Sequence, residues 1–132
     1  MKKKISIVTP TLNERENIEY FISQVREEME KLEFEYEHII IDNCSNDGTV
    51  EILRNIVKSD PKVKVILNSR NFGSVRSPFY GLLQCTGDAA ILINADFQDP
   101  IDLIPKYIDK WNEGKDIVLN EKLKSDENKF VF

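Results

Sequence analysis

Three short polar segments of the sequence carry the carboxylate, amide and hydroxyl side chains that bind phosphates, bases and divalent cations. They span residues 9–14 (TPTLNE), 42–49 (DNCSNDGT) and 94–100 (NADFQDP). Each segment directly follows an apolar run of the length of a β-strand. Ligands of open parallel sheets bind beyond the carboxyl ends of the strands, so we expect the three segments to form one site at one edge of a sheet.

Asp42 and Asp96 are the strongest candidates for a binding role within these segments. Each comes after an apolar strand, where a carboxylate without a partner would be costly. Either residue alone could equally be structural. Their matching positions after two different strands make a shared site the better interpretation.

Other polar residues of the same segments have simpler explanations. Asn13 can cap the following helix, with Glu16 completing a capping box, and such a role is compatible with ligand contact. Asp47 belongs to a turn sequence, Asn-Asp-Gly. Asp99 precedes Pro100, which is the pattern of an N-cap followed by proline at the first helical position.

The elements that must position these segments alternate between strand and helix patterns. The sequence predicts strands at residues 5–8, 36–41, 63–67, 89–93 and 116–119, and helices over residues 18–32, 50–57, 75–85 and from residue 101 onward. The run at 89–93 is apolar throughout, which is typical of a central strand buried on both faces. This alternation predicts an α/β domain with a central, mostly parallel sheet flanked by helices.

Composition restricts the partners of this domain. The 132 residues, 41% of them hydrophobic, can build one buried core, and the net charge of -5 argues against non-specific binding of nucleic acid. No apolar stretch approaches the roughly 18 residues that cross a bilayer. Cys44 and Cys85 lack the spacing of a disulfide framework or zinc site, so we expect both to be reduced and buried.

Taken together, the motifs resemble those of the family 2 glycosyltransferases, and in particular of the branch that loads a sugar onto a polyprenyl phosphate such as dolichol or undecaprenyl phosphate. The motifs that carry the resemblance are residues 7–14, 42–49, 70–73, 81–84, 86–88 and 95–100, with Trp111, Gly114 and residues 116–118. Each is weak alone, but their order and spacing cover nearly the whole chain. The resemblance implies a GT-A fold, which is a Rossmann-like nucleotide-sugar-binding domain.

The resemblance also assigns residues to a nucleoside pocket. Pro10, Leu12 and Glu14 would line it, and the backbone near Ile40 would close over the base. Asp42 would accept the imide N–H of uracil or the corresponding N–H of guanine. An ionised carboxylate suits this task because it only accepts hydrogen bonds.

A metal site is implied next to this pocket. Asn94, Ala95 and Asp96 occupy the position of the family's DxD motif, and Gln98 matches a further supporting position. Asn94 stands where many members carry aspartate, so the cation would lose one negative ligand. Asp96, the carbonyls of Asn94 and Gln98, phosphate oxygens and water could still complete a hard oxygen shell for Mg²⁺ or Mn²⁺. Asp96 would be the catalytic residue of this set.

The implied reaction is an inverting transfer of a sugar from a nucleoside diphosphate sugar to a polyprenyl phosphate, and the resemblance favours UDP over GDP. A saccharide hydroxyl is the alternative acceptor, and it would need a general base. A third possibility is a fragment that binds the nucleotide sugar without transferring it. Arg70 and Arg76 could face phosphate, although solvent-exposed arginine is the more common situation.

Residues 1–120 are assigned to the nucleotide-sugar-binding core, and residues 121–132 to the start of a truncated acceptor-side segment. The polar stretch after Asn120 and the apolar ending Phe130-Val131-Phe132 lead us to expect that the natural chain continues. The expected location is the cytoplasm, at the cytoplasmic face of the membrane for the full-length protein. Membrane association would then depend on regions outside this sequence.

Two other α/β classes fit the sequence less well. A receiver domain would end its first strand in an acidic pair and its third in an aspartate, whereas these strands lead into Thr9-Pro10 and Asn68-Ser69. A sugar-phosphate nucleotidyltransferase would carry a glycine-rich loop after the first strand, and this loop has no glycine. Both classes are therefore disfavoured.

Overall fold

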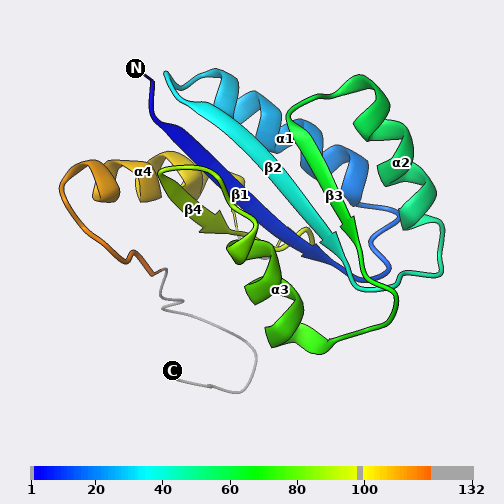
Figure 1. Cartoon of the computed structure of the whole chain (residues 1–132). Helices are drawn as coiled ribbons and strands as arrows, with labels where there is room; N and C mark the ends of the chain where they lie inside the picture. Colours follow the sequence, from blue (N-terminus) through cyan, green and yellow to red (C-terminus); the bar gives the residue numbers. More distant parts are fainter. Residues whose placement is uncertain (1, 98–99, 120–132) are drawn as a thin grey trace, which may run out of the picture.

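The computed structural model of the chain describes residues 2–97 and 100–119, and its centre is a four-stranded parallel sheet (Figure 1). The strand order is β3-β2-β1-β4. The strands are β1 (Lys4–Thr11), β2 (Glu35–Asp42), β3 (Val63–Leu67) and β4 (Ala89–Leu92). The helices are α1 (Ile18–Glu30), α2 (Thr49–Ser59), α3 (Gly73–Leu83), the short 3-10 helix η1 (Ile101–Leu103) and α4 (Ile104–Asn112). The predicted α/β architecture is confirmed.

The helices cover both faces of the sheet. Helices α1, α2 and α4 pack on one face and form the larger core, while α3 packs on the other face against β1 and β2 (Figure 1). Residues alternate between the two faces along each strand. Ile5 and Ile7 of β1 therefore enter the larger core, whereas Val8 enters the smaller one.

Helix α1 follows the predicted apolar stripe, but its beginning differs from the prediction. Ile18, Phe21 and Val25 are buried on one side, as the helical spacing requires. The helix begins at Ile18, with Asn17 in the N-cap position and without a side-chain cap. Asn13 has φ of 54° and lies outside the helix, so the predicted capping box was wrong.

The predicted strand at residues 116–119 is also wrong. This segment has no strand structure, and Ile117 and Leu119 are 80% and 86% exposed. A strand needs the backbone of a neighbour to pair with, and within the described residues β4 pairs with β1 alone. A cavity of about 580 Å³ lies between β4 and residues 115–119. Strand β4 is thus an edge of the sheet in this part of the chain, where a central strand was expected.

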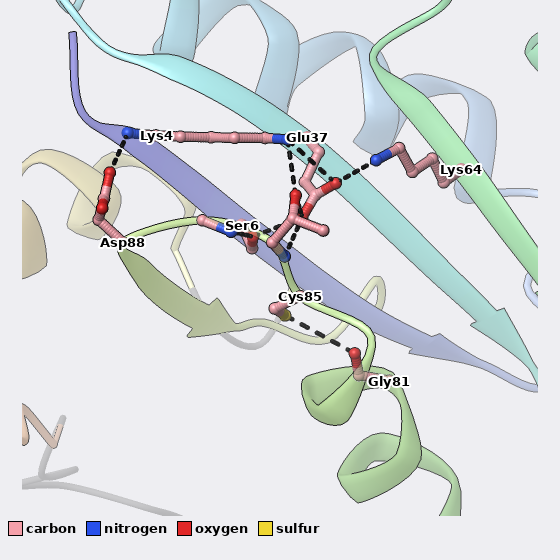
Figure 2. A network of polar contacts seen from close by, with 9 residues as sticks. Lys4, Ser6, Glu37, Lys64, Gly81, Cys85 and Asp88 are labelled. Carbon is pink, nitrogen blue, oxygen red and sulfur yellow. Dashed lines mark hydrogen bonds and ion pairs between the residues drawn. The ribbon is translucent and has the colours of Figure 1, made fainter. Parts of the chain in front are cut away.

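A buried carboxylate, that of Glu37, connects several elements at the amino ends of the strands. Glu37 is 2% exposed and accepts hydrogen bonds from Ser6 Oγ (2.6 Å), Thr86 N (2.7 Å) and Lys64 Nζ. Lys4 Nζ lies 3.5 Å from the same carboxylate. Figure 2 shows Glu37 between the two lysines, with Ser6 beside it. The network joins β1, β2 and β3 to the connection between α3 and β4.

Glu37 should make stability depend on pH in the acid range. Burial opposes its ionisation, but the hydrogen bonds from Lys64, Ser6 and Thr86 outweigh burial and lower its pKa from 4.5 to about 2. Ionised Glu37 therefore contributes about 3 kcal/mol to the free energy of unfolding. This contribution is fully present above pH 4.5 and is lost as the pH falls toward 2. We expect urea unfolding to show this loss, and Glu37→Gln to flatten the pH dependence. Glu35→Gln, an exposed substitution in the same strand, is the matched control and should leave the pH dependence as in the parent.

Candidate functional site

The carboxyl ends of β1, β2 and β4 meet at one edge of the sheet. Thr11, the last residue of β1, is in register with Asp42, the last residue of β2. Strand β4 runs parallel to β1, with Leu92 beside Val8. Residues 94–96 therefore follow β4 at the same edge as Asp42, as predicted.

Asp42 is fully buried and organises the loop that follows β2. Its carboxylate accepts hydrogen bonds from Thr11 Oγ1 (2.7 Å), Ser45 N (2.8 Å) and Ser45 Oγ (2.6 Å). The side chain is 0% exposed. A base can therefore reach the carboxylate only if Ser45 moves away. The role of Asp42 as an acceptor for a base stays a prediction, while its structural role is shown.

The loops after β1 and β2 are held together by hydrogen bonds of Asn13, which was predicted to cap a helix, with Ser45 and Asn46. Asn46 N donates to Asn13 Oδ1 (3.0 Å), and Asn13 N donates to Ser45 Oγ (2.8 Å). Asp47 accepts from the backbone and hydroxyl of Thr49 at 3.0 and 2.5 Å, and the Thr49 hydroxyl lowers the pKa of the Asp47 carboxyl. The turn interpretation of Asp47 is confirmed. Asn13 makes a contact between loops instead of capping a helix.

A cavity of about 680 Å³ opens at this edge on the α3 side of the sheet. Three residues predicted to bind the nucleotide sugar line it, namely Pro10, Leu12 and Asn94. The remaining wall comes mainly from the first half of α3. Glu14, Asp42 and Asp96 do not line this cavity.

Two other predicted residues, Ile40 and Ala95, have their side chains in the core. Only backbone groups of these residues could face a ligand. Backbone pairing places Ile40 between Thr9 and Val65 of the neighbouring strands, two residues before β2 ends. Their contact with a nucleotide stays a prediction.

Asn43 is a site residue that the sequence analysis missed. Its side chain is buried, donates to Asn71 Oδ1 (2.7 Å) and Gly73 O (3.2 Å), and accepts from Phe72 N (2.8 Å) and Asn68 Nδ2 (3.2 Å). These bonds fix the loop that leads into α3 and so set one wall of the cavity. The asparagines at 68 and 71 were the available signal in the sequence for this polar cluster. They lie 25 residues or more from Asn43, so the sequence did not show that they contact it.

Cys44 and Arg70 lie in loops at this edge, whereas Cys85 lies near Ser6 and Glu37 at the amino ends of the strands (Figure 2). Cys44 is exposed, with φ of 68°, and Cys85 is half-buried. The expectation that both would be buried was wrong for Cys44, because its loop turns outward after Asn43. The Arg70 guanidinium lies 4.6 Å from the centroid of the Phe72 ring, at the entrance to α3.

Asn94 and Asp96 carry side-chain oxygens of the kind that bind divalent cations. Both are exposed, whereas Ile93 and Ala95 beside them are buried. Their amide and carboxylate oxygens are ligands that Mg²⁺ and Mn²⁺ accept. Gln98, the third predicted ligand, and Asp99, the predicted N-cap, lie outside the described residues.

Glu14 lies near enough to Asp96 for their charges to interact. Partial burial raises the pKa of Glu14, a hydrogen bond from Asn17 lowers it, and the charge of Asp96 raises it further. The described part of the chain contains no group of three or more His, Cys, Asp or Glu residues arranged to hold a metal ion. A cation at Asn94 and Asp96 would therefore take further oxygen ligands from a substrate and from water, which the donor set permits.

The family model of glycosyl transferase family 2 matches residues 6–131. The chain belongs to glycosyl transferase family 2. It is 45% identical over 116 residues to the bactoprenol glucosyl transferase of Shigella phage SfX, covering 88% of this chain and 38% of that protein. The chain thus spans less than half the length of this relative.

Solved structures show that the fold is shared with other members of this class. The mannosyltransferase PcManGT from Pyrobaculum calidifontis, solved in complex with GDP-Man and Mn²⁺, is 18% identical with a TM-score of 0.62, over 76% of this chain and 34% of that one. TarS residues 1–349 from S. aureus, in complex with UDP-GlcNAc, is 24% identical with a TM-score of 0.55, over 83% and 32%. The predicted GT-A fold is confirmed. None of the helices described here has the length and apolar character required to span a membrane.

Proposed function

We propose that this family 2 chain forms the donor-binding part of an enzyme that transfers a sugar from a nucleoside diphosphate sugar to a polyprenyl phosphate. The observation that carries the proposal is the meeting of Pro10, Leu12 and Asn94 around one cavity at the carboxyl edge of the sheet. Asp96 follows Asn94 by two residues in the same loop. The similarity to a bactoprenol glucosyl transferase supports a polyprenyl phosphate as the acceptor. Neighbouring structures with GDP-Man and with UDP-GlcNAc support a nucleotide-sugar donor, and we favour UDP.

Each part of the site has a distinct task in this proposal. Pro10 and Leu12 pack against the nucleoside, and the loop that Asp42 organises closes the adjacent wall. Asn94 and Asp96 hold a divalent cation, Mg²⁺ or Mn²⁺, which offsets the negative charge that develops on the leaving diphosphate. The structure with GDP-Man and Mn²⁺ supports the use of a divalent cation within this fold.

The proposed transfer is a single inverting displacement. An anionic oxygen of the polyprenyl phosphate forms a bond to the anomeric carbon, and the bond from that carbon to the diphosphate oxygen breaks. The nucleoside diphosphate leaves with the electron pair. No proton has to be removed from the acceptor, because a phosphate oxygen is already ionised near neutral pH. We place this reaction at the cytoplasmic face of a membrane, where a nucleotide sugar and a lipid phosphate can meet.

Direct binding measurements test the proposal. We expect UDP with Mn²⁺ to stabilise the 132-residue chain against unfolding, by about 2.7 kcal/mol when free UDP is about 100 times its Kd. Either component alone should give a smaller effect, since each supplies ligands to the other. GDP, ADP and UDP-glucose titrated in parallel define the nucleoside and the sugar. Equal stabilisation by all nucleotides, without any effect of Mn²⁺, would contradict the assigned site.

A further inference from the structure

The residue after Asp96 is attached to helix α1 through aromatic contacts. The Phe97 ring centroid lies 5.6 Å from that of Tyr20, with the planes tilted by 42°, and 5.6 Å from that of Phe21, in an edge arrangement of 74°. Both are favourable geometries for aromatic pairs. Phe21 is fully buried between the sheet and α1. Phe97 therefore connects the loop after β4 to the rigid core.

The backbone at Phe97 adopts a conformation that its residue type disfavours. Its φ is 60°, in the left-handed region that glycine and asparagine occupy readily but bulky side chains avoid. Such a conformation persists only when the surroundings impose it. The ring contacts with α1 are interactions that can do so, although 38% of Phe97 remains exposed.

We propose that Phe97 is a positioning residue that fixes the loop at residues 94–97 and so holds Asp96 at the carboxyl edge of the sheet. The ring lies against Tyr20 and Phe21 of α1, and the preceding residue, Asp96, lies near enough to Glu14 for their charges to interact. That Phe97 anchors the loop is inferred from these contacts alone. That the anchored loop favours cation binding rests on the proposed function.

Three substitutions at Phe97 separate the effect of the ring from the effect of the backbone conformation. Phe97→Ala removes the ring and keeps an unfavourable φ, Phe97→Gly removes the ring and relieves the backbone, and Phe97→Tyr keeps the ring. Ile56→Ala is the matched control, because Ile56 is half-buried and packs on the same core from α2. Its substitution lowers stability without touching the loop.

The first measurement needs no ligand. Heteronuclear NOE values and amide exchange of residues 94–96 should report increased motion in Phe97→Ala and Phe97→Gly, and parent-like order in Phe97→Tyr and Ile56→Ala. Ordered amides in Phe97→Gly would overturn the proposal, because the loop would then hold its shape without the ring. This result is independent of whether the chain binds nucleotide.

The second measurement is calorimetric titration of Mn²⁺ and UDP at a temperature where every variant is folded. Affinity should fall roughly three- to tenfold in Phe97→Ala and Phe97→Gly, the loss that corresponds to about one aromatic contact that pre-orders Asp96. Phe97→Tyr and Ile56→Ala should bind like the parent. Parent-like affinity in Phe97→Gly would overturn the positioning role. Absence of Mn²⁺ and UDP binding in the parent would instead refute the proposed function and leave the NMR comparison to decide the anchoring role.

Discussion

Replacing Asp96 with alanine should abolish most of the dependence of nucleotide binding on a divalent cation. Asp96 supplies the negative charge of the proposed ligand pair, because Asn94 contributes only a neutral oxygen. Without it the cation is held mainly by the diphosphate, and we expect the affinity for UDP in the presence of Mn²⁺ to fall on the order of 100-fold. Calorimetric titration with Mn²⁺ and with EDTA measures this dependence directly.

Three further variants make the result specific. Asp102→Asn removes an exposed carboxylate from η1 and should change nothing. Asn94→Asp adds a second negative ligand and should tighten Mn²⁺ binding. Asp42→Ala should weaken nucleotide binding with or without Mn²⁺, because it removes the carboxylate that organises the loop through hydrogen bonds from Thr11 and Ser45. An Asp96→Ala variant with the same Mn²⁺ dependence as the parent would refute the assignment of Asp96.

The parts of the fold that the sequence predicted are those with a local, repeating signal. The stripe of Ile18, Phe21 and Val25 defined α1, and the run at 36–41, which ends in three isoleucines, defined β2. The edge at which Asp42 and residues 94–96 meet followed from the parallel pairing of strands alone. Such features depend on periodicity and chain direction, which are visible without coordinates.

The predictions that were wrong or incomplete depend on contacts between distant segments. Asn13 had the local pattern of a helix cap, but a hydrogen bond from Asn46, across 33 positions, holds it outside the helix. Asp42 was predicted to face a base, yet Thr11 and Ser45 surround its carboxylate. No pattern within a short stretch of sequence indicates such distant hydrogen-bond partners. Of the residues predicted from family resemblance, Pro10, Leu12 and Asn94 line the cavity at the expected edge, and Asn43 sets an additional wall.

Glu37 illustrates the same limit at the other edge of the sheet. In the sequence it is one of two glutamates flanking Tyr36, and nothing there distinguishes it from exposed Glu35. Its burial is explained by hydrogen bonds from Lys64 and from the Thr86 backbone, which are distant in the sequence. Removing any partner of this buried carboxylate would leave charge or hydrogen-bonding groups unsatisfied.

Gly87→Ala should destabilise the protein strongly, because this position has no room for a methyl group. A Cβ at residue 87 would lie 2.8 Å from both Lys4 O and Ser6 N, and 2.7 Å from Ser6 Oγ. The first two are backbone atoms of β1, which pairs with β2 and β4 and cannot shift without disturbing both ladders. We expect the free energy of unfolding in urea to fall by about 2–3 kcal/mol, at the upper end of typical overpacking costs.

Adding Ser6→Ala to Gly87→Ala separates the clash with the Ser6 side chain from the clashes with the backbone of β1. It removes the Ser6 hydroxyl, but the two backbone contacts remain, so the double variant should be no more stable than Gly87→Ala. Gly114→Ala is the complementary control, since a Cβ there meets nothing within 4 Å and the only cost comes from its φ of 96°. Recovery of the parent stability in the double variant would show that the hydroxyl alone excludes the methyl group. A Gly87→Ala protein within about 0.5 kcal/mol of the parent would show that the connection between α3 and β4 can move away from β1, and the hydrogen bond from Asp88 N to Lys4 O (2.7 Å) should then exchange its proton faster.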